Sequence, residues 1–196
     1  MALAAATAAV AGERGAPAVD AAPWVRPTAP EARVLTLVDI EARLLSAHNR
    51  ERAAVGHPPL QWDPQLAAAA AAYGPVLAGH ERLVHSPRDS RRGQAENLAM
   101  AYRGTHSPEQ LVAMWTVEKR LMRPGLFPAV SATGYWKDVG HYTQMVWPTT
   151  THVGCAIHFA EWEYLICRYS PPGNKDGKPV FAPPASGGPT TIAARR

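Results

Sequence analysis

The feature that most restricts the fold is a pair of strand-like runs, each of which carries one of the chain's two cysteines. Residues 152–159 alternate apolar and other side chains, and residues 162–169 also have the character of a strand. If they form a hairpin centred on Glu161, Cys155 lies opposite Cys167, at a Cα separation that a disulfide can span. The sequence therefore predicts a disulfide-linked hairpin, with two buried free thiols as the alternative.

A third alternating run precedes this hairpin. Residues 141–148 would place His141, Thr143, Met145 and Trp147 on one face of a strand. A histidine beside bulky apolar groups is either a satisfied core residue or a site residue. The run predicts a third antiparallel strand.

Helices are expected in the first part of the chain. The first runs over residues 37–55, with Thr36 as a plausible N-cap and Gly56 at its end. A second begins after Asp63, which is a good N-cap, and Pro75 is expected to end or kink it.

The second and third helices carry different signals in their sequences. Residues 66–73 are nearly all alanine, so this helix can approach a neighbour closely. The third opens with Ser107, Pro108 and Gln110, which fit a capping box. A short strand is expected over residues 93–98. Helices followed by an antiparallel run indicate the α+β class.

Two glutamates stand among apolar residues. Leu111, Trp115, Glu118 and Met122 have the spacing of one helical face, and Glu96 precedes another apolar run. Burying an unpaired carboxylate in such a place would cost on the order of several kcal/mol. Both glutamates are therefore expected to have a cationic or metal partner.

Composition narrows the function classes. The net charge is +4 and the basic residues are scattered, so nucleic-acid binding is not expected. No run of 18 apolar residues exists, so no transmembrane segment is expected. Residues 1–35 are interpreted as a leader or disordered arm, residues 36–182 as one domain, and residues 183–196 as a flexible tail. The oligomeric state stays open, with a monomer as the expectation.

Several short motifs occur in an order that is typical of one protein family. They are His48–Arg52, Val84–Ser86, Gln94–Leu98, Trp115–Glu118, Gly140–Trp147 and Ile166–Asn174. Over about residues 36–181 the set resembles the CAP superfamily, which comprises cysteine-rich secretory proteins, antigen 5 and class 1 pathogenesis-related proteins, here in a bacterial-type form with a single cysteine pair. The resemblance implies a three-layer α-β-α sandwich around a central antiparallel sheet. It also implies the Cys155–Cys167 bridge and export to an extracellular or periplasmic space.

The resemblance further implies a central cleft with two histidines and two glutamates, here His85, Glu96, Glu118 and His141. Two neutral imidazoles would suit Zn²⁺ or another divalent cation, with the glutamates fixing the imidazole tautomers. The alternative is a purely structural hydrogen-bonded network with no ligand.

The function that follows is a secreted, defence- or envelope-related binding module. Its ligands would be a divalent cation, a lipid or sterol, or a partner in the cell envelope. A metal-dependent hydrolase and a purely structural domain are the alternatives. No nucleophile is obvious, because Ser86 would point away from His85 on a strand. His48 is interpreted as structural.

Overall fold

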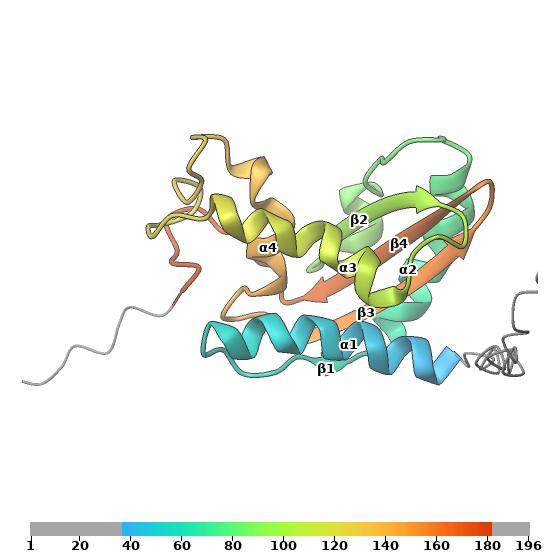
Figure 1. Cartoon of the computed structure of the whole chain (residues 1–196), viewed down its shortest axis with the longest axis horizontal. Helices are drawn as coiled ribbons and strands as arrows, with labels where there is room; N and C mark the ends of the chain where they lie inside the picture. The colour runs from blue at the N-terminus through green and yellow to red at the C-terminus, as the bar shows by residue number, and fades with distance from the viewer. Residues whose placement is uncertain (1–36, 182–196) are drawn as a thin grey trace, which may run out of the picture. The chain divides into compact units, whose positions relative to one another are not determined.

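A computed structural model describes residues 37–181, and all structural statements concern these residues. The predicted leader, the tail and the Thr36 cap lie outside them. Within this part of the chain, no helix combines the length and apolar character needed to cross a bilayer. In chain order (Figure 1), the main elements are α1 (Leu37–Ala54), β1 (Gln61–Trp62), α2 (Pro64–Ala78), β2 (Ala95–Tyr102), α3 (Pro108–Thr116), α4 (Gly140–Met145), β3 (His152–Phe159) and β4 (Trp162–Ser170).

The strands form one sheet in the order β1-β3-β4-β2. The predicted hairpin is confirmed, because β3 and β4 are antiparallel with Cys155 opposite Cys167. These cysteines form a disulfide with a Cα–Cα distance of 4.1 Å. β2 pairs with the other side of β4, also antiparallel, whereas the two-residue β1 runs parallel to β3.

Helices cover both faces of the sheet, as Figure 1 shows. Side chains of β4 alternate between the faces. Tyr164 and Ile166 pack in a cluster with Leu77 of α2. On the opposite face, Leu165 and Tyr169 belong to the larger cluster that contains apolar residues of α1, α3 and α4. The α+β fold and its three layers are therefore confirmed.

The alanine-rich α2 packs tightly on β3. The Asp63 side chain caps it as predicted, with Oδ1 accepting the Gln65 N–H at 2.8 Å. A Cβ atom at Gly154 of β3 would lie only 2.2 Å from the backbone nitrogen of Ala67. Of the two alternatives expected at Pro75, an end of the helix is wrong, because α2 continues to Ala78. Pro75 is exposed and costs one backbone hydrogen bond, while Leu77 in the same last turn is fully buried.

The strand predicted over residues 141–148 is wrong, because Gly140–Met145 forms the short helix α4. Tyr142, Met145 and Val146 are buried at spacings of three and four residues, as on a helix. The physical reason for the error is burial on all sides. Every residue from 142 to 147 is buried, so neither period stands out against a polar face.

The third helix begins as predicted, with a complete capping box between Ser107 and Gln110. It ends earlier than its apolar spacing suggested. The α-helix stops at Thr116, and Val117–Leu121 continues as a tighter 3-10 helix, η2, which contains Glu118. Placing Met122 on the same helical face is therefore wrong. The predicted strand at 93–98 is instead the longer β2, and β1 was not predicted.

Arg52 anchors α1 to the end of α4 and the turn that follows it. Its guanidinium is 1% exposed and donates to the carbonyl oxygens of Met145, Trp147 and Thr150 at 2.8–3.1 Å, and its Nε donates to Pro58. Burial lowers the pKa of Arg52 to about 10, so the group stays charged at neutral pH. One side chain thus satisfies carbonyl groups in the turn that follows α4.

Candidate functional site

The first half of the site is built on β2. His85 Nδ1 lies 2.8 Å from Glu96 Oε1, and the imidazole is half exposed whereas the carboxylate is buried. The other carboxylate oxygen, Oε2, accepts the Ser86 hydroxyl at 2.8 Å and lies 2.9 Å from Arg168 Nε. Arg168 is the direct cross-strand neighbour of Glu96 on β4. The expected cationic partner of Glu96 is therefore an arginine.

These contacts keep Glu96 ionised. Burial acts to raise the pKa of Glu96, but the hydrogen bonds from His85 and Ser86 and the charge of Arg168 outweigh it, so the pKa lies below its usual value. Sequence reasoning missed Arg168. Its signal was a charged residue on the strand face that also carries Trp162, Tyr164 and Ile166, where an arginine needs a buried acid.

The second half of the site joins η2 to α4. His141 Nδ1 lies 2.6 Å from Glu118 Oε1. Glu118 Oε2 accepts the backbone N–H groups of His141 and Tyr142 at 3.0 and 2.9 Å. Val139, at the N-cap position of α4, supplies no side-chain cap. Glu118 therefore caps α4 from another segment and, with the same carboxylate, orients the imidazole.

The two halves are linked through the residue after Glu96. Asn97 Nδ2 donates to the His141 carbonyl oxygen at 3.0 Å and to the Tyr169 hydroxyl at 3.2 Å. That hydroxyl in turn lies 2.8 Å from His48 Nε2, while His48 Nδ1 donates to the Leu44 carbonyl. A chain of buried polar groups thus runs from α1 to the site, and His48 occupies a structural position within it.

Because His48 is part of this buried series of polar groups, the stability of the protein should depend on pH. Burial lowers the pKa of His48 to about 4, and the nearby Arg52 charge adds to that effect. The unfolded chain, in which His48 has its ordinary pKa, takes up the proton first, so the free energy of unfolding should fall by about 3 kcal/mol as pH drops from about 6.5 to 4. His57, whose pKa burial also lowers, adds in the same direction.

Denaturant titrations across this pH range test the effect. His48→Gln should lose most of the pH dependence, even though the substitution itself destabilises the protein. His80 is exposed, so His80→Gln should keep the wild-type dependence. An unchanged slope of unfolding free energy against pH in His48→Gln would show that this imidazole does not titrate as stated.

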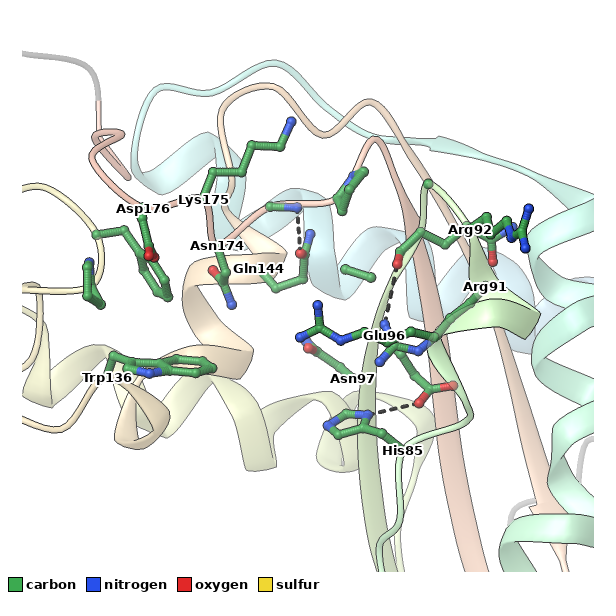
Figure 2. Close-up of a pocket in the computed structure, with 18 residues that line it drawn as sticks. His85, Arg91, Arg92, Glu96, Asn97, Trp136, Gln144, Asn174, Lys175 and Asp176 are labelled. Carbon is green, nitrogen blue, oxygen red and sulfur yellow. Dashed lines mark hydrogen bonds and ion pairs between the residues drawn. The ribbon is translucent and has the colours of Figure 1, made fainter.

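A cavity of about 960 Å³ lies beside the first pair. Figure 2 shows Trp136 at one end and Arg91 and Arg92 at the other, with Asn97 and Asn174 between them. His85 and Glu96 line it, whereas His141 and Glu118 adjoin it through Asn97. The lining residues are His85, Arg88, Arg91–Asn97, Phe127, Pro128, Trp136, Gln144 and Pro172–Asp176.

The donor set fits a divalent cation in part. Each imidazole has Nδ1 bonded to a carboxylate, which presents Nε2 as the metal ligand. Within the described residues, the only group of three ligand atoms within 4.8 Å of one another belongs to His48, Cys155 and Cys167. That group is no metal site, because both sulfurs are joined in the disulfide. Within the same residues, neither His85 nor His141 belongs to such a group, and of the two only His85 lines the cavity.

No covalent nucleophile is paired with either imidazole in the described residues. The Ser86 hydroxyl donates to Glu96 and accepts from Arg168 at 3.0 Å. It is buried and has no bond to His85. The arrangement can bind and orient a ligand or a cation. The carboxylate that Ser86 contacts, Glu96, is paired with Arg168 and has a lowered pKa, so it is a poor base for activating a nucleophile.

The sequence is similar to plant and insect proteins over most of its length. It is 41% identical to pathogenesis-related protein 1A of Nicotiana tabacum, with 70% of this chain and 78% of that protein covered. It is 38% identical to a PR-1 type pathogenesis-related protein of Sambucus nigra, covering 68% and 77%. It is 33% identical to venom allergen 5 of Brachyponera chinensis, covering 75% and 85%.

The fold is also similar to solved structures. The crystal structure of NaASP2 with Zn²⁺ superposes with a TM-score of 0.62 and 25% identity, covering 73% of this chain and 85% of that chain. Na-ASP-1 gives the same TM-score at 24% identity, covering 73% and 41%. Residues 45–169 match the family described as CAP, the cysteine-rich secretory protein family. With its hairpin, its three layers and its relatives in agreement, the chain belongs to the CAP family.

Proposed function

We propose that this protein is an exported binding module whose site takes a divalent cation, with zinc as the first candidate. One observation carries the proposal: two imidazoles each have Nδ1 bonded to a glutamate at 2.6–2.8 Å. This pairing fixes the tautomer, so Nε2 of His85 and of His141 is the available ligand atom. The similar protein NaASP2 was crystallised with Zn²⁺, which supports the choice of metal. When bound, the cation would supply a positive centre with water-filled coordination positions.

Each residue of the tetrad has a separate part in this proposal. His85 and His141 would contact the cation. Glu96 and Glu118 would orient the imidazoles. Arg168 already neutralises Glu96, and two backbone N–H groups already satisfy one oxygen of Glu118, so neither carboxylate depends on a metal for partners. The same contacts favour the competing view of a structural network without a ligand. A metal titration separates the two views.

Calorimetric titration of chelator-treated protein with zinc is the test. We expect a strong site at about pH 7.5 that weakens steeply by about pH 5.5, because protons compete for both imidazoles. His85→Ala and His141→Ala should each abolish it. Glu118→Gln should weaken it less, since the amide oxygen still accepts a hydrogen bond.

His80→Ala is the matched control, because His80 is exposed and does not line the cavity. It should bind zinc like the wild type. If the double variant His85→Ala/His141→Ala binds zinc as tightly as the wild type, the cation site does not exist. The tetrad is then a structural network.

We also propose that the protein works outside the cytoplasm, in defence or at the cell envelope. The disulfide favours an oxidising compartment. The names of the relatives, pathogenesis-related protein and venom allergen, support a role in defence or in interactions between organisms. Exported protein should show no alkylation of Cys155 or Cys167 in mass spectrometry under non-reducing conditions. Two free thiols in the exported form would contradict this proposal.

The site favours binding over hydrolysis. A hydrolase would need an activated nucleophile or a metal-bound water beside a substrate. Ser86 is engaged by Glu96 and Arg168, so only the metal route is open to the second candidate. Zinc-loaded protein that cleaves peptide or ester substrates, and His141→Ala that does not, would support it.

A further inference from the structure

The cavity is larger than a cation site needs. Its volume of about 960 Å³ lies at the upper end of the range for organic ligand sites. Its walls also differ chemically from one end to the other (Figure 2). An organic ligand that fills it must therefore match both ends.

One end is a wall of arginines. Arg88 lies on the 3-10 helix η1 (Arg88–Arg91), and Arg91 and Arg92 follow at its end. Within the described residues no carboxylate forms an ion pair with any of the three. Glu96, a buried acid that lines the same cavity, is already paired with Arg168. This end of the cavity therefore carries uncompensated positive charge.

Arg91 is held in place for a ligand. Its Nε donates to the Ser86 carbonyl at 3.1 Å and its Nη1 to the Gln94 carbonyl at 3.4 Å. Carbonyl partners orient the guanidinium without neutralising it. The pKa of Arg168 is lowered, mainly because the side chain is buried. The charge of Glu96 acts to raise this pKa, and the charge of Arg91 acts to lower it. A bound anion would relieve this repulsion.

The other end is an aromatic platform, with Asp176 near it (Figure 2). Trp136 is 36% exposed, and its indole lies against Gly140, where a Cβ atom would come within 3.0 Å of the ring. Phe127 meets it edge to face, with ring centroids 5.3 Å apart. The indole is thus fixed from two sides while part of it stays accessible. A fixed aromatic face suits the apolar C–H face of a sugar ring.

Polar groups lie between the two ends. Asn174 has both amide atoms bonded, to Thr143 and to Gly140, so it is rigid. Asn97 Nδ2 is engaged, whereas its Oδ1 accepts no hydrogen bond from the described residues. The half-exposed His85 adds Nε2. Such fixed acceptors and donors are suited to hydroxyl groups.

We propose that the cavity binds an acidic oligosaccharide, with its carboxylate or sulfate groups at Arg88, Arg91 and Arg92 and a sugar ring on Trp136. The proposal rests on the proposed function only in using the same cleft. It needs no cation, so the two can fail separately. Arginine forks provide paired donors for planar anions, and the aromatic platform adds selectivity for rings over simple ions.

The test uses the full chain, stripped of metal with a chelator, and titrates it with tetragalacturonic acid. The fully methyl-esterified tetramer is the matched probe, because it keeps the rings and removes the charge. We expect the acid to bind and the ester to bind at least about tenfold more weakly. Added salt should weaken the binding of the acid. Equal binding of acid and ester would overturn the proposal.

Variants locate the binding. The double variant Arg88→Gln/Arg92→Gln should bind tetragalacturonic acid at least about tenfold more weakly, since charge-assisted hydrogen bonds are lost. Arg50→Gln/Arg103→Gln removes the same charge away from the cavity and should change affinity less than about twofold. Trp136→Ala should weaken binding about fivefold, and Trp136→Phe should recover part of it.

Two further arms complete the design. Zinc titrations of the arginine variants should match the wild type, so a failed sugar test leaves the cation proposal intact, and a failed zinc test leaves the sugar proposal intact. Vesicles of neutral lipid with and without phosphatidic acid provide another anionic surface. Binding to the acidic vesicles without binding to tetragalacturonic acid would overturn the proposal in favour of a lipid ligand, as would arginine variants that bind the sugar normally.

Discussion

Trp115→Ala should lower the free energy of unfolding by about 3–5 kcal/mol, which is the usual cost of removing a buried tryptophan. Trp115 is 2% exposed and belongs to the main core cluster. Its Nε1 donates to the Leu98 carbonyl at 3.0 Å, so the variant also leaves a β2 carbonyl without its partner. Its ring stacks on His141, at 6.1 Å between centroids. The variant should therefore loosen the site as well.

Denaturant unfolding of Trp115→Ala measures the first effect. Met114→Ala is the control on the same helix, since Met114 is 37% exposed, and it should cost less than about 1 kcal/mol. A cost below about 1 kcal/mol for Trp115→Ala would mean that α3 does not pack on the sheet as described.

Gly154→Ala should cost about 3 kcal/mol or more, because overpacking against rigid atoms cannot be relaxed by a side-chain movement. The new methyl group would lie 2.2 Å from the Ala67 nitrogen and 2.4 Å from the Asp63 carbonyl oxygen. Both are backbone atoms at the start of α2, where the Asp63 N–H also donates to Val153. The helix must move away from β3 as a whole.

Thermal and denaturant unfolding of Gly154→Ala should both show the loss. Gly79→Ala is a suitable control, because its Cβ would meet nothing nearer than 3.5 Å and its φ of −64° is ordinary. That variant should be nearly neutral. A Gly154→Ala protein as stable as the wild type would show that α2 and β3 are further apart than described.

Local signals in the sequence were sufficient for much of the fold. The caps at Asp63 and Ser107 depend on residues within one turn, and both were predicted. The hairpin register followed from the turn position, which fixed Cys155 opposite Cys167. In each case the interacting groups are near neighbours in the chain, so their spacing contains the answer.

Other parts depend on contacts that spacing does not encode. α4 was predicted as a strand because it is buried on every side, and its cap comes from Glu118, more than twenty residues away. The tetrad residues were named by family resemblance, yet their pairing as His85 with Glu96 and His141 with Glu118 emerges only in three dimensions. Arg168 completes the first pair from another strand. The cation and ligand roles of these residues stay predictions.

The strand order has a consequence for the time at which this protein can fold. β4 lies between β3 and β2, yet it is the last strand to be synthesised. Until residues 162–170 have left the ribosome, β2 has no partner strand among the described residues for its backbone hydrogen bonds. The sheet therefore cannot be completed until almost the entire described chain has emerged. Pairing of strands this far apart in the sequence is slow, and it leaves the apolar β2 exposed in the meantime.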